Sequence, residues 1–174
     1  MTAPTFVLRA LDPTREADLA WVAQGMHLTL VEVDGEQGRA TWPVAATRQR
    51  LEELLDAGRH VAQVFLAVSA VDPAAIAGHT IVRLNAMPDG RRYGLVSTTY
   101  VAPARRRSGI ADALLDRGEA WLRAQGMAEA ATWTSAANVR LIRLYEKHGY
   151  AVTERGDKDG SAMVRLTKPL PVTS

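Results

Sequence analysis

The chain has 174 residues, of which 47% are hydrophobic and 23% are charged, and its formal net charge is +2. These values are typical of one globular domain and exclude a disordered or fibrous chain. A nucleic-acid-binding protein usually shows a larger basic excess on one face, so a polyanionic partner is not favoured, although the arginine run 105–107 leaves that alternative open.

The chain contains no cysteine, which excludes disulfides, thiolate metal sites and a covalent cysteine intermediate. Its first residues lack the basic start and apolar run of a secretory signal, and no apolar stretch approaches the roughly 20 residues of a membrane span. We therefore expect a cytoplasmic protein without membrane contact. No metal is expected either, because the histidines show no metal-ligand spacing: they are His27, His60, His79 and His148.

The N-terminal half predicts two helices and a series of strands. The helices are expected over 15–26, where Leu19, Val22 and Ala23 share one face, and over 44–57. The segment between them, 31–43, is rich in turn formers and acids and predicts a loop. Apolar runs bounded by turn residues predict strands, which suggest an antiparallel meander: they cover 6–11, 61–71, 76–84 and 94–101.

The C-terminal half alternates between helix and strand patterns. Helices are expected over 109–125 and 138–148, a strand over 130–134, and a last hairpin from 150–155 and 162–166. No internal repeat or linker is present. The sequence therefore predicts a single α/β domain over 1–174, in which a mixed, mostly antiparallel sheet of about seven strands is flanked by about four helices.

A basic turn joins the strand 94–101 to the helix that starts at Gly109. The first backbone N–H groups of a helix have no partner within it and favour an anion. Gly109 leaves room for a phosphate, Ala111 is small, and the arginines 105–107 add charge. A solvated basic turn or a nucleic-acid patch explains an arginine run equally well. No Walker Gly-Lys-Ser/Thr follows, and no Gly-x-Gly-x-x-Gly is present.

The residues further along narrow these alternatives. The pattern Arg106-x-x-Gly109-x-Ala111, with Asn138 and Tyr145 downstream and Gly-Tyr following, resembles the GNAT N-acetyltransferase superfamily over about 95–150. The resemblance implies the GNAT fold and acetyl-CoA as cosubstrate, with the pyrophosphate at the helix start. The residues implied there are Arg106, Arg107, Ser108, Gly109, Ile110 and Ala111.

The resemblance also divides the chain and assigns the remaining site residues. Residues 5–93 would carry the acceptor-side helices, 94–150 the acetyl-CoA-binding core, and 151–174 the final hairpin and tail. The backbone N–H of Val101 would bind the acetyl carbonyl oxygen, and Asn138 would contact the pantetheine arm. The hydroxyl of Tyr145 would protonate the leaving thiolate.

Two of these residues have plain structural alternatives. Asn138 is also a good N-cap for a helix that starts at Val139. Tyr145 falls beside Leu141 and Leu144, as a core aromatic would.

The general base is not apparent. Many family members carry a glutamate on the strand equivalent to 94–101, and here that strand has no carboxylate. Ser97 and Thr99 can order a water, and His79 has a suitable ordinary pKa but is more simply structural. Acids of the expected loop would suit a cationic amine, although a solvated turn accounts for them as well: they are Glu32, Asp34 and Glu36.

We therefore predict an N-acetyltransferase that acts by direct attack of a primary amine, from a small molecule or a protein, in a ternary complex. Trp21 and Trp42 are candidates for the acceptor pocket, or simply packing residues. A homodimer is common among relatives. The alternatives are a non-catalytic acyl-CoA-binding or interaction domain on the same fold, and a nucleic-acid binder built on the arginines.

Overall fold

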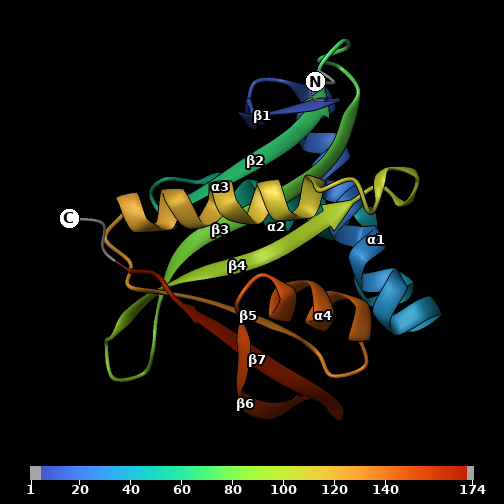
Figure 1. The fold of residues 1–174 in the computed structure, drawn as a ribbon. Coiled ribbons are helices and arrows are strands. Elements are labelled where there is room, and N and C mark those ends of the chain that lie inside the picture. The colour runs from blue at the N-terminus through green and yellow to red at the C-terminus, as the bar shows by residue number, and fades with distance from the viewer. Residues whose placement is uncertain (1–4, 172–174) are drawn as a thin grey trace.

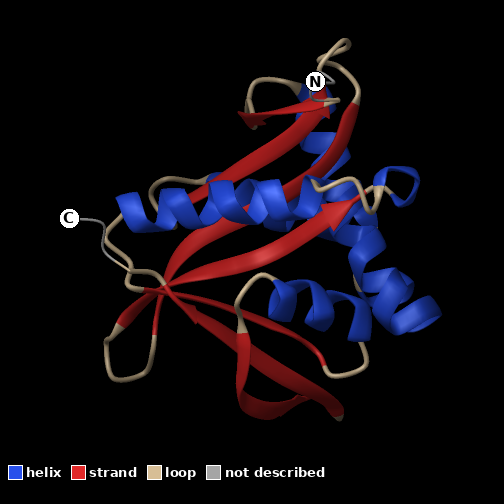
Figure 2. Ribbon diagram, in the orientation of Figure 1, coloured by secondary structure: helices blue, strands red, loops and turns tan. Residues whose placement is uncertain are grey.

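A computed structural model describes residues 5–171. Seven strands form one sheet in the order β1-β2-β3-β4-β5-β7-β6, with helices on both faces (Figures 1 and 2). The strands are β1 Phe6–Ala10, β2 Ala62–Ser69, β3 Ile76–Ala86, β4 Arg92–Val101, β5 Glu129–Ser135, β6 Ala151–Lys158 and β7 Ser161–Pro169. The helices are α1 Glu16–Thr41, α2 Val44–Leu55, α3 Ile110–Ala124 and α4 Val139–Lys147, and a 3-10 turn, η1, covers Pro103–Arg105.

The sheet is mixed and mostly antiparallel, as the sequence predicts. Only β4 and β5 run parallel; every other neighbouring pair is antiparallel. Each predicted strand is present; in the last hairpin the strands extend further toward the turn than expected, and β7 continues to Pro169. Within the described residues, none of the helices combines the length and apolar composition that a membrane crossing requires.

Helix α1 is much longer than the sequence pattern predicts. The expected helix over 15–26 continues through the expected loop and ends at Thr41, just before Pro43. The loop prediction for 31–43 was wrong because it relied on glycines, each of which costs a helix only about 1 kcal/mol, while no proline interrupts the segment before Pro43. Contacts with other elements also hold it, since Glu32 is paired with two arginines.

Strands β4 and β5 separate soon after they meet. They pair only at Gly94–Ala130 and Leu95–Ala131. Beyond that point β4 continues beside β3 and β5 beside β7, so the two strands diverge (Figure 1). The far half of β4 therefore presents one edge to a gap in the sheet rather than to a neighbouring strand.

A β-bulge in β4 lies just beyond this separation. Ile81 of β3 pairs with Thr98, whereas Val82 pairs with Val96, so Ser97 has no partner in the ladder. A bulge turns the following side chains and increases the local twist. It therefore sets the direction of every side chain from Ser97 to the end of β4.

The core has two layers, one on each face of the sheet. Helices α1 and α2 cover one face, and α3 and α4 contribute to the larger cluster on the other. Helix α3 lies very close to the sheet: a Cβ added at Gly94 would come within 2.6 Å of Leu122, and one at Gly118 within 2.9 Å of Val82. The second half of α3 is thereby fixed against the beginning of β4 and the middle of β3.

A buried carboxylate ties α3 to the C-terminal strands. Glu119 of α3 is almost fully buried. Lys168 of β7 donates to it from Nζ at 2.7 Å, and the hydroxyl of Tyr150 donates to it at 3.0 Å. A buried charge is tolerated only when it is paired and hydrogen-bonded, and both conditions are met here.

Candidate active site

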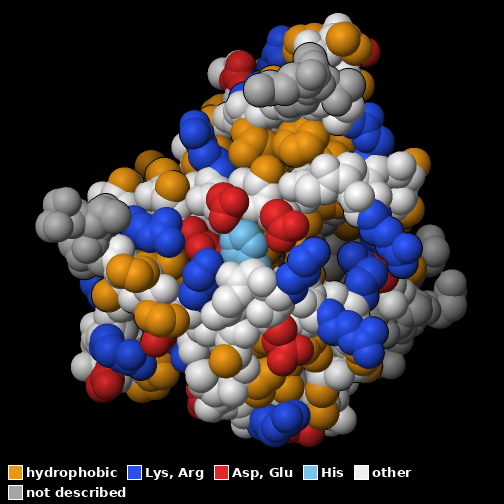
Figure 3. All heavy atoms as spheres, viewed as in Figure 1, with side chains coloured by type: hydrophobic (Ala, Val, Ile, Leu, Met, Phe, Trp, Pro, Cys, Tyr) orange, Lys and Arg blue, Asp and Glu red, His pale blue; other side chains and the backbone are white. Residues whose placement is uncertain are grey.

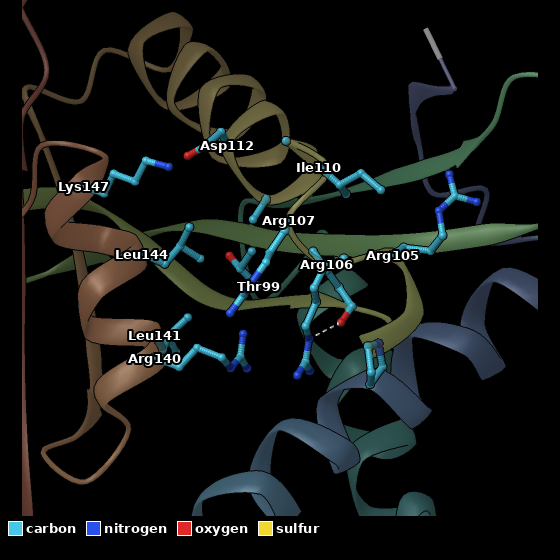
Figure 4. A pocket seen from close by; sticks show the side chains of 14 residues that line it. Thr99, Arg105, Arg106, Arg107, Ile110, Asp112, Arg140, Leu141, Leu144 and Lys147 are labelled. Atoms are coloured by element: carbon cyan, nitrogen blue, oxygen red, sulfur yellow. Dashed lines mark hydrogen bonds between the residues drawn. The ribbon is translucent and has the colours of Figure 1, made fainter.

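A cavity of about 560 Å³ lies where β4 ends and α3 begins (Figure 4). Its walls come from β4, η1, the first turn of α3 and one face of α4. Among its described lining residues five are basic and one, Asp112, is acidic, and Figure 3 shows Lys and Arg side chains gathered around a hollow on this face. The basic residues are Arg105, Arg106, Arg107, Arg140 and Lys147.

The first turn of α3 is open toward this cavity. Gly109 is the N-cap residue, with φ 83° and no side-chain cap, and a Cβ added there would meet nothing within 4 Å. The first intrahelical bond runs from the Ala113 N–H to the Gly109 carbonyl at 3.1 Å. The N–H groups of Ile110, Ala111 and Asp112 precede that bond and lack a partner within the helix.

The predicted cofactor residues of this turn do not all behave alike. Arg106, Arg107, Gly109, Ile110 and Ala111 line the cavity. Figure 4 shows Arg106, Arg107 and Arg140 converging on it, while Arg105 turns away. Ser108 lies outside the wall, and its hydroxyl donates to the carbonyl of Arg105.

Arg106 and Arg140 are bridged by one carboxylate. Arg140 donates from Nη2 to Glu32 at 2.7 Å, and Arg106 donates to the other oxygen of the same carboxylate. Glu32 was one of the acids expected to suit a cationic amine, but its charge is already engaged by two arginines. The side chains of Asp34 and Glu36, the other two acids of that group, lie outside the described residues.

The peptide groups at the end of β4 alternate in direction. The Ala102 N–H donates to the carbonyl of Ala77 in β3 at 2.8 Å. Because successive residues of a strand bond to opposite sides, the N–H and carbonyl of Val101 point away from β3 and into the gap between β4 and β5. The carbonyl accepts a hydrogen bond from Arg106 Nε at 3.0 Å, which agrees with this direction (Figure 4).

Tyr145 lies at a second cavity, of about 290 Å³, which adjoins the first at Thr99 and Leu141. Its side chain is fully buried, and its hydroxyl donates to Thr99 Oγ1 at 3.4 Å. Burial raises the pKa of Tyr145 above its ordinary value, so the phenol keeps its proton. Tyr145 is thus both the core aromatic of its helix and a hydrogen-bond donor at the junction of two cavities.

Asn138 has the capping role that its position predicts. Its side-chain oxygen accepts the Leu141 N–H at 3.2 Å at the start of α4. It also lines the second cavity rather than the basic one. Its capping bond and a place on the cavity wall therefore coexist.

His79 is unsuited to act as a general base. It is completely buried, and burial lowers its pKa to about 3. Its Nε2 lies 3.0 Å from Thr98 Oγ1, and its ring packs against Trp21 and Tyr100. Trp21 is accordingly a packing residue, whereas Trp42 lines the second cavity.

A third cavity, of about 340 Å³, continues from the second and contains residues that sequence reasoning missed. Arg83, Arg50, Lys158 and Trp133 line it. Only Arg83 gave a signal in the sequence, as a charge within the apolar strand 76–84. The others come from α2, β6 and β5, whose meeting depends on the tertiary structure.

Comparison with known proteins agrees with this architecture. The family model described as the acetyltransferase (GNAT) family matches residues 28–150. The chain belongs to the acetyltransferase (GNAT) family. It is thus an N-acetyltransferase that depends on acetyl-CoA, a family activity that leaves the acceptor open. No match was found among curated proteins.

Solved structures show the same fold. A chain of the NatC complex bound to Gag peptide and CoA matches with a TM-score of 0.73 and 19% identity, covering 96% of this chain and 99% of that one. Ard1 from Thermoplasma volcanium matches with a TM-score of 0.68 and 17% identity, covering 96% of this chain and 99% of that one. The ribosomal-protein-S18-alanine N-acetyltransferase from Escherichia coli matches with a TM-score of 0.65 and 18% identity, covering 97% of this chain and 96% of that one.

Proposed function

We propose that this protein transfers the acetyl group of acetyl-CoA to a primary amine by direct attack, with the cosubstrate in the basic cavity and the amine entering from the second. One observation carries the proposal: the two cavities meet at Thr99, in the gap between β4 and β5, beside the hydroxyl of Tyr145. A thioester placed at this junction is accessible to an amine from the other side.

The residues of the basic cavity fit the diphosphate of acetyl-CoA. The unpaired N–H groups at Ile110 and Ala111 favour an anion at the helix start, and the open backbone at Gly109 allows it to approach. Arg107 adds a charge that can bind phosphate oxygens, and Arg106 fixes the end of β4 through the carbonyl of Val101.

When bound, acetyl-CoA supplies an acyl group already activated as a thioester. The N–H of Val101, directed into the gap, is suited to donate to a carbonyl oxygen on which charge develops. Tyr145, held protonated by burial, is suited to donate to a departing sulfur. Asn138 lines the second cavity, on the side of the junction where Tyr145 lies.

Strand β4 carries no carboxylate that could accept the proton lost by the amine. The hydroxyls of Ser97 and Thr99 line the second cavity and can order a water there. A direct attack, without an acetylated cysteine, follows from a sequence that contains no cysteine.

A transfer assay tests the proposal. The protein is incubated with acetyl-CoA and a panel of primary amines, and the acetylated amines are detected by mass spectrometry together with released thiol. We expect at least one amine to be acetylated in proportion to enzyme. Binding of acetyl-CoA without product from any amine would contradict transfer to a primary amine at this junction.

A further inference from the structure

The second and third cavities form one groove beside the end of β4. Their walls share Trp42, Ser97, Thr98 and Trp133, so we call the two together the acceptor groove. Trp42 follows α1 and is 41% exposed, and Trp133 belongs to β5 and is 39% exposed. Two partly exposed indoles in one groove favour a ligand with a flat or apolar body.

The charge of this groove is positive. Arg83 of β3, Arg50 of α2 and Lys158 of β6 line the third cavity, and no carboxylate is among its described lining residues. In the second cavity the described lining holds a single acid, Asp159. A ligand with several positive charges would be repelled here.

Within the described part of the chain, Arg83 has no counter-ion. It is half-buried, its Nε donates to Ser97 Oγ at 3.4 Å, and no carboxylate in the described part of the chain lies within salt-bridge distance of it. Burial, together with the like charge of Arg50, lowers its pKa from the ordinary value. Among the described carboxylates, Arg50 pairs only with Glu53, at 3.5 Å. A half-buried guanidinium beside another cation is stabilised by an oxyanion, which it can bind through two N–H groups.

We propose that the acceptor is an amine that also carries an oxyanion, a carboxylate or phosphate, which Arg83 binds with help from Arg50 and Lys158. This inference rests on the proposed function. Ser97, which contacts Arg83, and Thr99, which contacts Tyr145, lie two residues apart on β4, a separation of about 7 Å. The amine and the oxyanion of the acceptor are therefore separated by several bonds, with an apolar body between them beside the tryptophans.

Four matched amines test this inference: 4-(aminomethyl)benzoate, 4-(aminomethyl)phenylphosphonate, 4-(aminomethyl)benzamide and 1,4-bis(aminomethyl)benzene. Steady-state rates of thiol release are measured with saturating acetyl-CoA at pH 7.5. We expect kcat/KM for one of the two anionic amines to exceed that for the benzamide at least about tenfold, because a charge-assisted hydrogen bond to the oxyanion contributes that much. The diamine should have the lowest kcat/KM of the four. Whichever of the two anionic amines has the higher kcat/KM shows whether the natural acceptor carries a carboxylate or a phosphate.

Variants assign the effect to residues. Arg83→Gln is expected to raise KM for the preferred anionic amine about tenfold and KM for the benzamide much less. Arg83→Lys is expected to recover part of the loss. Arg50→Gln, on a helix surface, provides an independent variant with a smaller loss of the same kind. Arg59→Gln is the matched control, because Arg59 is exposed and lines none of the cavities; we expect it to change nothing.

Calorimetric binding of the four amines to the CoA-loaded protein separates this inference from the proposed function. Tighter binding of an anionic amine, lost in Arg83→Gln, supports the inference even if turnover is absent, and absent turnover then counts against the proposed function alone. Equal binding of the benzamide or the diamine, or an Arg83→Gln variant that keeps the preference, would overturn the inference while leaving the transferase activity intact.

Discussion

Tyr145 and His79 are both completely buried, and burial acts on them in opposite directions. The charged form of the tyrosine is its deprotonated form, so its pKa rises and it keeps its proton. The charged form of the histidine is protonated, so its pKa falls to about 3 and it stays neutral. The first is therefore suited to donate a proton at the junction of the cavities, and the second cannot accept one near neutral pH.

Replacement of Tyr145 by Phe tests its role. We expect kcat to fall at least about tenfold with little change in the KM for acetyl-CoA, because the ring still packs while the donor is lost. Tyr93→Phe is the control, since that hydroxyl accepts a hydrogen bond from Asn85 and lines none of the cavities. A kcat for Tyr145→Phe equal to that of the control would refute a role as acid.

The lowered pKa of His79 makes the stability of the protein depend on pH. The unfolded chain protonates this histidine near pH 6.5, but the folded protein does so only near pH 3, so the unfolded state binds more protons between these values. The resulting contribution is fully present above pH 6.5 and is lost as the pH falls. Between pH 7.5 and 5.5 it amounts to about 1 kcal/mol of the free energy of unfolding.

Urea unfolding of wild type and His79→Gln at both pH values measures this contribution. The wild type should lose more stability on acidification than the variant, by about 1 kcal/mol. Other titrating groups are common to both proteins and cancel in the comparison. Equal losses would mean that the folded protein protonates His79 as readily as the unfolded chain does.

At the scale of elements, the start of α3 is the feature on which cosubstrate binding depends. Gly109 adopts φ 83° with open space around it, and Gly126 adopts φ 84° at the other end of the helix, also with open space. A side chain at either position costs about 1–2 kcal/mol for the left-handed backbone. Only at Gly109 does it also obstruct the basic cavity.

The two glycines therefore give a matched pair of variants. Gly109→Leu and Gly126→Leu should lower the melting temperature similarly, but only the first should weaken CoA binding, by about tenfold or more in calorimetric titration, because it blocks the approach of the diphosphate. If Gly109→Leu bound CoA as tightly as the wild type, the diphosphate would not bind at this helix start.

The elements also show where sequence patterns suffice and where they fail. Local signals located α3 and α4, because apolar periodicity, Gly109 and Asn138 mark their limits. The same reasoning failed at 31–43, where glycines outweighed the helix formers and the pairing of Glu32 with arginines far along the chain was not visible. The pairing joins residues 74 and 108 positions apart, beyond the reach of any local pattern.

At the scale of the whole molecule, the gap between β4 and β5 brings the two halves of the proposed site together. The family resemblance predicted the motif residues of the basic turn, and all of them except Ser108 line the basic cavity. The acceptor groove was not, because Arg50, Arg83, Trp133 and Lys158 belong to four elements that meet only in the folded sheet. The close packing of α3 against β3 and β4, and its tie through Glu119 to Tyr150 and Lys168, hold α3 against the sheet.

The most direct test of the central claim is the melting temperature of the protein with acetyl-CoA, with free CoA and with a short polynucleotide. A ligand at a hundredfold excess over its Kd adds about 2.7 kcal/mol to the free energy of unfolding, which for a chain of this size raises the melting temperature by roughly 5–10 °C. We predict that rise with both CoA species and none with the polynucleotide. No rise with CoA, or an equal rise with the polynucleotide, would contradict a cosubstrate site at the start of α3.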